Sequence, residues 1–331
     1  MSNAPLLSIA DLIVGFRSES GRLRAVDGVD LQVERGEAVG LVGESGCGKS
    51  TVAMAILGLL PAAAKDRSGS IHFDGQDLMA SGGRALRKVR GRRIGMVFQD
   101  PMTSLNPYLT VGMQIAEPLR LHLGMDRAQA RARSAELMKE VGIPDAADRL
   151  DRHPHEFSGG QRQRLLIAMA LACDPELLIA DEPTTALDVT VQAQILDLLR
   201  EQQRKRGMGL LLVSHDLGVI AGTCDRVAVM YAGRIVEQAT ASDLFAHPRH
   251  PYTHGLLQAI PRLDRPRGGD LATIKGLPPR LAAGWSGCAF AARCAHAEAR
   301  CRNEVPPWLS PSEGHHHRCI HADMSQEADH G

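Results

Sequence analysis

Residues 43–50 read Gly-Glu-Ser-Gly-Cys-Gly-Lys-Ser and follow an apolar run. They fit G-x-x-x-x-G-K-[ST], a loop whose glycines let successive backbone N–H groups point at phosphate oxygens. We expect a helix to begin near Lys49 and to add the positive end of its dipole. Lys49 is predicted to reach the β- and γ-phosphates of a nucleotide, and the Ser50 hydroxyl to hold Mg²⁺. The nucleotide contacts predicted here are Gly43, Glu44, Ser45, Gly46, Cys47, Gly48, Lys49, Ser50 and Thr51.

A second candidate site ends the apolar run Leu-Leu-Ile-Ala at residues 177–180 with two carboxylates, Asp181 and Glu182. At the carboxyl edge of a sheet, Asp181 is placed to bind Mg²⁺ directly or through water. Glu182 is predicted to polarise a water for attack on the γ-phosphate. An exposed acidic turn is common by itself, so the coexistence with the phosphate loop is what favours this interpretation. Cys47 takes a variable loop position and is interpreted as a small space-filling residue.

Four of the seven cysteines, Cys288, Cys294, Cys301 and Cys319, cluster near the end of the chain. Their gaps of 5, 6 and 17 residues contain no C-x-x-C pair, which makes ordinary structural zinc less attractive without excluding it. Four thiolates can equally hold an iron–sulfur cluster, and unligated thiols in a loop-rich tail remain an alternative. No targeting segment is apparent, so disulfides are disfavoured. Nearby histidines could be alternative ligands, but we expect a solvated polar loop; they are His315, His316, His317 and His321.

The elements that must position these residues follow from short apolar runs that end where loops and helices begin, the pattern of a buried, mostly parallel sheet. Predicted strands are Leu7–Ile13, Ala38–Val42, Ile94–Phe98, Leu177–Ala180, Leu210–Val213 and Arg226–Tyr231. Predicted helices are Lys49–Leu60, Ala128–Val141, Gly160–Ala172 and Val189–Arg206. Between Pro101 and His155 the pattern is helical and loop-like, which indicates a helical subdomain inserted into an α/β core.

Composition limits the function classes. The 331 residues are 44% hydrophobic, 23% charged and 3% aromatic, with 38 Lys and Arg against 38 Asp and Glu. This balance gives no electrostatic reason to expect nucleic acid. The basic run Arg84, Arg87, Lys88, Arg90, Arg92 and Arg93 is therefore interpreted as a solvated helix face. The longest apolar run, residues 52–64, is shorter than the roughly 20 residues of a membrane span, so a membrane role must come through partners.

Residues 157–161, Phe-Ser-Gly-Gly-Gln, lie shortly before the acidic strand and resemble the signature motif of ABC ATPases. Ser158 is also a good helix N-cap. The resemblance implies that this helix start, through Ser158, Gly159, Gly160 and Gln161, faces the γ-phosphate of an ATP held by an opposite subunit. Two glycines and a helix dipole suit such an anion site.

Other positions resemble further ABC elements. Gln99 matches the Q-loop glutamine, which implies contact with Mg²⁺ and the attacking water, and residues 185–188 look like the D-loop. His215 matches the switch histidine that contacts the γ-phosphate. Phe16 resembles the A-loop aromatic that stacks on adenine, but it could equally be a core residue. Loop residues Ser18–Arg24 lengthen the usual spacing and weaken that assignment.

Residues 99–107, Gln-Asp-Pro-Met-Thr-Ser-Leu-Asn-Pro, are similar to the oligopeptide/dipeptide importer ATPases. So are His250-Pro251-Tyr252-Thr253 with Leu256-Leu257, Gly287-Cys288-Ala289-Phe290 and Arg293-Cys294. Relatives of this kind include nickel and glutathione importers. For the terminal cysteines the resemblance implies a [4Fe–4S] cluster, with Zn²⁺ as the alternative.

The resemblance implies an α/β, ABC-type P-loop nucleotide-binding domain over residues 1–245, with the helical subdomain at about 101–170. A small cysteine-containing extension would occupy 246–331. The implied partners are a second, related ABC ATPase subunit, two integral membrane permease subunits and an extracytoplasmic substrate-binding protein, with no nucleic acid. The implied location is peripheral, on the cytoplasmic face of the inner membrane. Rival interpretations are a soluble ABC ATPase of DNA repair or translation, and a kinase built on the same phosphate loop.

Overall fold

The computed structural model describes residues 4–18, 21–64, 66–260, 273–279 and 285–321. The chain forms two compact units, each made of discontinuous segments. Unit 1 comprises Met1–Leu6, Val33–Ala38 and Phe73–Val213, and unit 2 comprises Leu7–Gln32, Val39–His72 and Ser214–Gly331. Within the described residues, no helix combines the length and hydrophobicity needed to cross a bilayer.

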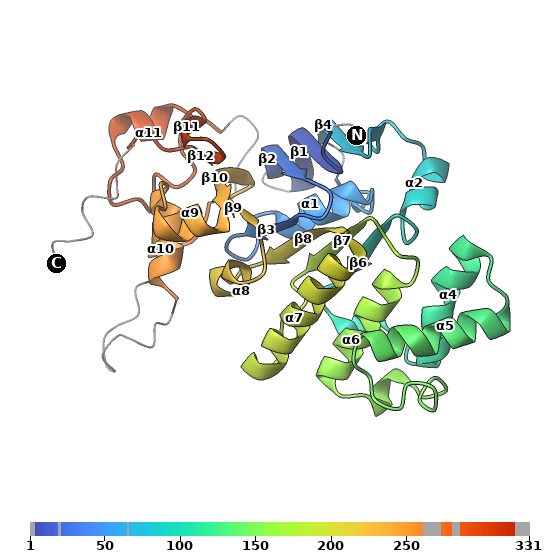
Figure 1. Ribbon diagram of the computed structural model, residues 1–331. Helices are drawn as coiled ribbons and strands as arrows, with labels where there is room; N and C mark the ends of the chain where they lie inside the picture. The colour runs from blue at the N-terminus through green and yellow to red at the C-terminus, as the bar shows by residue number, and fades with distance from the viewer. Residues whose placement is uncertain (1–3, 19–20, 65, 261–272, 280–284, 322–331) are drawn as a thin grey trace. The chain divides into compact units, whose positions relative to one another are not determined.

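Unit 1 contains a parallel group of strands in the order β8-β7-β6 (Figure 1). The bounds are Gly209–Ser214 for β8, Leu177–Asp181 for β7 and Ile94–Val97 for β6, and a two-residue β5 covers Gln76–Asp77. Leu177 pairs with Ile94 on one side and with Gly209 on the other. Every residue of β7 and β8 is buried, as expected for parallel strands covered on both faces.

The helices of unit 1 support the predicted helical insertion. They are α2 (Gly83–Val89), α3 (Pro101–Ser104), α4 (Val111–Leu123), α5 (Arg127–Glu140), the 3₁₀ turn η1 (Pro154–Glu156), α6 (Gly159–Leu171) and α7 (Val189–Arg206). Helices α4, α5 and α6 pack against one another (Figure 1). Helix α7 ends at Gly207, which adopts φ +61°, directly after three basic residues that favour the negative end of the helix dipole.

Unit 2 contains the strand order β2-β1-β4 and a second group in the order β11-β12-β10-β9-β3. The bounds are Leu7–Ser18 for β1, Gly21–Val33 for β2, Ala38–Val42 for β3, Asp66–Phe73 for β4, Arg226–Tyr231 for β9, Arg234–Thr240 for β10, Leu309–Ser312 for β11 and His315–His317 for β12. Its helices are α1 (Lys49–Ile56), α8 (Leu217–Ala221), α9 (Ala241–Ala246), α10 (Pro251–Gln258) and α11 (Ala299–Asn303). Strand β3 runs parallel to β9, whereas β9-β10 and β10-β12 are antiparallel.

The structure confirms the predicted strands Ala38–Val42 and Arg226–Tyr231 and the helix Val189–Arg206, residue for residue. Three expectations were wrong. The helix from Lys49 ends at Ile56, not Leu60, because the chain leaves the helix at Leu57 and Gly58 follows with φ +60°. The first strand continues to Ser18, not Ile13. The expected loop Ser18–Arg24 is mostly strand, since β2 begins at Gly21.

Candidate functional site

The phosphate loop connects β3, whose five residues are all buried, to helix α1. Two of its glycines have no room for a side chain. A Cβ on Gly43 would lie 2.0 Å from the Met230 carbonyl oxygen, and one on Gly48 would lie 2.2 Å from that of Ala25. Gly48 also adopts φ +109°, which L side chains rarely reach. Close backbone packing therefore fixes the curve of the loop.

Lys49 is only 4% exposed. Its Nζ donates to the carbonyl oxygens of Gly43, at 2.7 Å, and Glu44, at 3.1 Å, so the ammonium lies inside the loop that was predicted to hold phosphates. Ser50 and Thr51 follow in the first turn of α1 and are half-buried. Cys47 is buried, as its space-filling interpretation requires, and burial raises the pKa of its thiol.

Residues far along the chain support this loop. The Tyr252 hydroxyl accepts a hydrogen bond from the Glu44 N–H at 2.9 Å, and the Arg293 guanidinium binds the Glu44 carboxylate. Both residues belong to segments that resemble the peptide-importer ATPases, and neither was predicted to have a role of its own. Their types carry no signal of it, because each acts through a contact more than 200 residues away in the sequence.

In unit 1 the acidic strand end and the Q-loop position come together. Asp181, the last residue of β7, is 3% exposed. Glu182 follows with φ +47°, a sparsely populated conformation for a residue with a side chain, and such conformations cluster at functional sites. Its carboxylate accepts hydrogen bonds from Gln99 Nε2, at 2.8 Å, and from the Thr185 hydroxyl, at 3.1 Å. The structure thus brings Gln99 to the predicted water-polarising carboxylate.

The signature residues begin helix α6. Ser158 is its N-cap: its hydroxyl accepts from the Gln161 N–H at 3.3 Å, and the Gln161 side chain accepts from the Ser158 N–H at 3.2 Å. This capping box confirms the prediction that Ser158 is a helix N-cap. Ser158 and Gly159 are nevertheless exposed. A Cβ on Gly160 would lie 2.7 Å from Val191 Cγ1, whereas one on Gly159 would only reach ordinary contact with Leu187, at 3.7 Å.

The remaining predicted residues lie at turns and in one strand. Asp188, at the end of the D-loop, caps α7 by accepting from the Val191 N–H at 3.0 Å. His215 directly follows β8 and is exposed. Phe16 is half-buried in β1. Phe16, the phosphate loop and His215 belong to unit 2, and Gln99, Asp181, Glu182 and residues 158–161 belong to unit 1.

The four terminal cysteines line one very small cavity of about 10 Å³ together with His250, Phe290 and His321. Cys301 and Cys319 are buried, and Cys288 and Cys294 are half-buried. Burial raises the pKa of the Cys288 and Cys294 thiols, and that of Cys319 to about 12. The described residues contain no group of three or more His, Cys, Asp or Glu arranged to hold a metal ion. Four convergent thiols are a donor set that suits soft metal chemistry, but the metal centre itself is not supported.

The expected solvated loop at His315–His317 was wrong, because these residues form strand β12 beside β10. His315 and His317 are buried, and His315 Nε2 lies 2.8 Å from the carboxylate of Glu237, which is 0% exposed. That carboxylate also accepts from the N–H groups of Arg249 and His250. Although burial opposes ionisation, these hydrogen bonds keep the pKa of Glu237 below its ordinary value.

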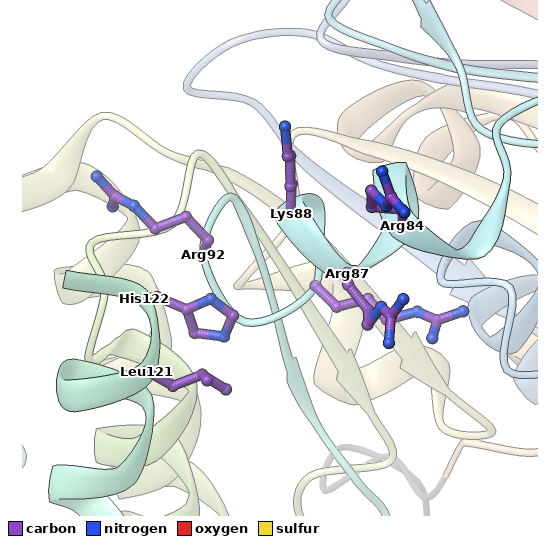
Figure 2. A pocket seen from close by; sticks show the side chains of 7 residues that line it. Arg84, Arg87, Lys88, Arg92, Leu121 and His122 are labelled. Carbon is purple, nitrogen blue, oxygen red and sulfur yellow. The ribbon is translucent and has the colours of Figure 1, made fainter. Parts of the chain in front are cut away.

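The basic run gathers around a separate cavity in unit 1 of about 640 Å³ (Figure 2). Figure 2 shows Leu121 and His122 projecting from α4 toward the side on which α2 carries Arg87 and Lys88. The cavity is also lined by Arg84, Arg87, Arg90 and Arg92, and its lining among the described residues includes no carboxylate. Arg84, Arg87 and Lys88 are exposed on one face of α2, as predicted for a solvated helix face. The prediction was wrong for Arg90, Arg92 and Arg93, because the helix ends at Val89 and Arg93 forms ion pairs with Asp74 and Glu176.

Comparisons with known proteins match both ends of the chain. Residues 26–185 match the family model "ABC transporter", and residues 236–301 match "Oligopeptide/dipeptide transporter, C-terminal region". A putative peptide import ATP-binding protein of Brucella ovis is 52% identical, over 97% of this chain and 98% of the relative. The dipeptide transport ATP-binding protein DppD of Bacillus subtilis is 49% identical over 97% and 96%. The oligopeptide transport ATP-binding protein OppD of Salmonella typhimurium is 49% identical over 95% and 93%.

Solved structures agree. The dimeric ATP-binding cassette MJ0796, in a post-hydrolysis state bound to ADP and Pi, superposes with a TM-score of 0.64 at 28% identity, over 71% of this chain and 98% of that one. CbiO1 from Clostridium perfringens, part of an ABC transporter complex, gives 0.62 at 30% identity, over 73% and 91%.

A phosphate loop between a buried strand and a helix, a parallel strand ending in two carboxylates and a capped signature helix define an ATP-hydrolysing P-loop cassette of mixed α/β fold. Full-length relatives at about 50% identity make the assignment more specific. The chain belongs to the ABC transporter family of ATP-binding proteins.

Proposed function

We propose that this chain powers a membrane importer of di- or oligopeptides. The observation that carries the proposal is the near-complete coverage by relatives named for peptide import, together with the C-terminal match over residues 236–301. The alternative proposals are that the importer carries nickel or glutathione. The domain limits stay a prediction: an ATPase domain over 1–245, its helical subdomain at about 101–170, and an extension over 246–331.

In the proposed mechanism, two subunits enclose each ATP. Phe16 stacks on adenine, and residues 43–51 hold the phosphates through backbone N–H groups and Lys49. Ser158, Gly159, Gly160 and Gln161 of the other subunit complete the site. His215 contacts the γ-phosphate, and Gln99 and Glu182 orient the attacking water. The 2.8 Å hydrogen bond between Gln99 and Glu182 supports the proposal that these two residues act together on the water.

Ser50, Gln99 and Asp181 are proposed to hold Mg²⁺, which would neutralise charge on the β- and γ-phosphates. Most of the rate enhancement would then come from positioning and charge stabilisation, so separating the two subunits would remove half of the site and stop turnover.

The proposed partners are a second, related ABC ATPase subunit, two permease subunits and an extracytoplasmic substrate-binding protein, with no nucleic acid. The chain would lie on the cytoplasmic face of the cell membrane. The transport function named for its relatives supports membrane partners, and the exposed signature helix start supports a second ATPase subunit.

We further propose that Cys288, Cys294, Cys301 and Cys319 hold a [4Fe–4S] cluster, with Zn²⁺ as the alternative. The shared cavity of the four thiols supports this. Anaerobically purified protein should be brown and contain about four iron atoms for each four-thiol site. Colourless protein with one zinc would overturn the cluster.

Uptake measurements test the transport proposal. The chain should be co-purified with its membrane subunits, reconstituted into vesicles with the binding protein, and supplied with labelled tripeptide, glutathione or Ni²⁺. Peptide should accumulate only with ATP, and a Glu182→Gln complex should fail. Accumulation of Ni²⁺ or glutathione alone would replace the cargo assignment, and co-purification with ribosomes or DNA instead of membrane subunits would contradict transport.

A further inference from the structure

A partly buried ion pair joins the C-terminal segment to the phosphate loop within unit 2. Arg293 donates from Nη1 to Glu44 Oε2 at 2.7 Å and from Nη2 to Glu44 Oε1 at 2.9 Å. Its side chain is 5% exposed and that of Glu44 is 24% exposed. This is a two-pronged guanidinium–carboxylate contact, the geometry that gives charged hydrogen bonds their greatest strength and directionality.

The guanidinium is held from several directions. It also donates to the carbonyl oxygens of Lys275, at 2.9 Å, and Ile274, at 3.0 Å, and to the Tyr231 hydroxyl at 3.3 Å. A lysine has one compact ammonium and cannot reproduce this planar set of donors. These further hydrogen bonds therefore fix the orientation of the Arg293 guanidinium independently of its contact with Glu44.

The backbone around Arg293 is fixed by the turns of the cysteine segment. The Arg293 N–H donates to the Phe290 carbonyl at 2.9 Å, and the Cys288 N–H donates to the Cys301 carbonyl at 2.7 Å. The Phe290 ring packs edge-on against Tyr231 and also contacts Tyr252, at centroid distances of 5.2 and 5.4 Å. Tyr252 in turn accepts from the Glu44 N–H. The aromatic cluster of Tyr231, Tyr252 and Phe290 therefore supports both Arg293 and Tyr252, the two residues whose side chains bind Glu44.

Glu44 is the first variable residue of the phosphate loop, and its carbonyl oxygen accepts from Lys49 Nζ. Its side chain, N–H and carbonyl are therefore held by Arg293, Tyr252 and Lys49, respectively. We propose that Arg293 is a positioning residue for ATP. By binding the Glu44 carboxylate, it helps the packed glycines to hold the phosphate loop in its curved conformation, so that nucleotide affinity depends on the C-terminal segment. ATP use by this loop is the family property that the proposal presupposes.

The test is ATPase kinetics of the assembled transporter with Arg293→Met. We expect the KM for ATP to rise about tenfold, which corresponds to roughly 1.4 kcal/mol, while kcat changes less than about twofold, because the groups that act on the γ-phosphate are retained. The matched control is Arg300→Met in the same segment, where the arginine is 60% exposed and pairs with exposed Glu304. That control should match the wild type.

A merely structural role predicts a different pattern. Partial unfolding lowers the active fraction and hence the apparent kcat, but it leaves the KM of the folded molecules unchanged. Arg293→Lys should keep the charge and still raise KM severalfold, because the second prong is lost. Glu44→Gln should raise KM like Arg293→Met, and the double variant should be no worse than either single variant.

An unchanged KM in Arg293→Met and Arg293→Lys, or additive effects in the double variant, would overturn the proposal. A wild-type complex that transports no peptide but hydrolyses ATP would instead contradict only the cargo assignment. The two failures are therefore distinguishable.

Discussion

The phosphate loop and the signature helix start are both proposed to contact phosphates, yet their surroundings differ. The loop is supported from behind, with Gly43 and Gly48 against backbone carbonyls and Glu44 held by Tyr252 and Arg293. The signature start satisfies its own N-cap through Ser158 and Gln161 and leaves Ser158 and Gly159 exposed. The phosphate loop is thus stabilised by other residues of its own chain, whereas the signature helix has a capped N-terminus that is exposed. This difference is what a site shared between two subunits requires.

The largest effect should come from Glu182→Gln, which keeps the shape of the side chain and removes the charge that is proposed to polarise water. We expect kcat of the assembled transporter to fall by about 10²–10³-fold, within the usual range for a general base, with ATP binding retained. Phosphate release and nucleotide retention measure the two quantities separately.

Glu201→Gln is the matched control, because Glu201 is an exposed carboxylate on α7. It should leave both quantities unchanged. Turnover at the wild-type rate in Glu182→Gln would remove Glu182 from the assigned role.

The two signature glycines should separate function from packing. Gly159→Ala adds a methyl to an open surface, so thermal stability should hold while ATP turnover falls at least tenfold, because the methyl occupies the face proposed to meet the other subunit's ATP. Gly160→Ala pushes a methyl to 2.7 Å from Val191 Cγ1, and such overpacking should cost about 1–3 kcal/mol of unfolding free energy.

Thermal denaturation and ATPase assays on both variants decide the matter. Full activity in Gly159→Ala would mean that nothing approaches this helix end closely, which would break the comparison.

A smaller effect should appear in the pH dependence of stability. His250 is buried, and its Nδ1 accepts from the Tyr252 N–H at the start of α10. Burial lowers the pKa of His250 from 6.5 to about 4, with nearby Glu237 opposing the shift and His317 adding to it. Because the folded protein keeps this imidazole neutral, its contribution is present above pH 6.5 and is lost as the pH falls toward 4. Between pH 7.5 and 5 the loss should be about 2 kcal/mol.

Chemical denaturation at the two pH values measures this loss. His250→Asn retains a cap acceptor and should flatten the dependence, whereas His247→Asn, at an exposed position, should not. A wild-type protein equally stable at both values would show that His250 is not held neutral.

Local signals predicted much of this molecule. Buried strands and a capped helix are encoded within a few residues, so β3, β9 and α7 were predicted with the correct bounds. Ser158 was placed at a helix start for the same reason, whereas the capping role of Asp188 was not predicted. Strand β2 and the last residues of β1 were missed, because the partly exposed residues of β2 give a weaker apolar signal than a buried run.

What the sequence could not reveal depends on distant contacts. Arg293 reaches Glu44 across 249 positions, and His315 reaches Glu237 across 78. Neither pairing produces a local sequence pattern. A run of three histidines is typical of a polar loop, and the buried carboxylate of Glu237 beside His315 is visible only in the folded chain. The cysteines show the converse: their clustering was visible, but spacing alone does not define a metal geometry.

The most direct test is a structure of the assembled transporter carrying Glu182→Gln, with ATP and Mg²⁺ bound. We predict that Ser158 Oγ lies about 3 Å from a γ-phosphate oxygen of the ATP whose phosphates are held by Lys49 of the other ATPase subunit. If both triphosphates are bound and every Ser158 lies more than about 10 Å from either of them, no hydrogen bond can join them and the shared site is contradicted.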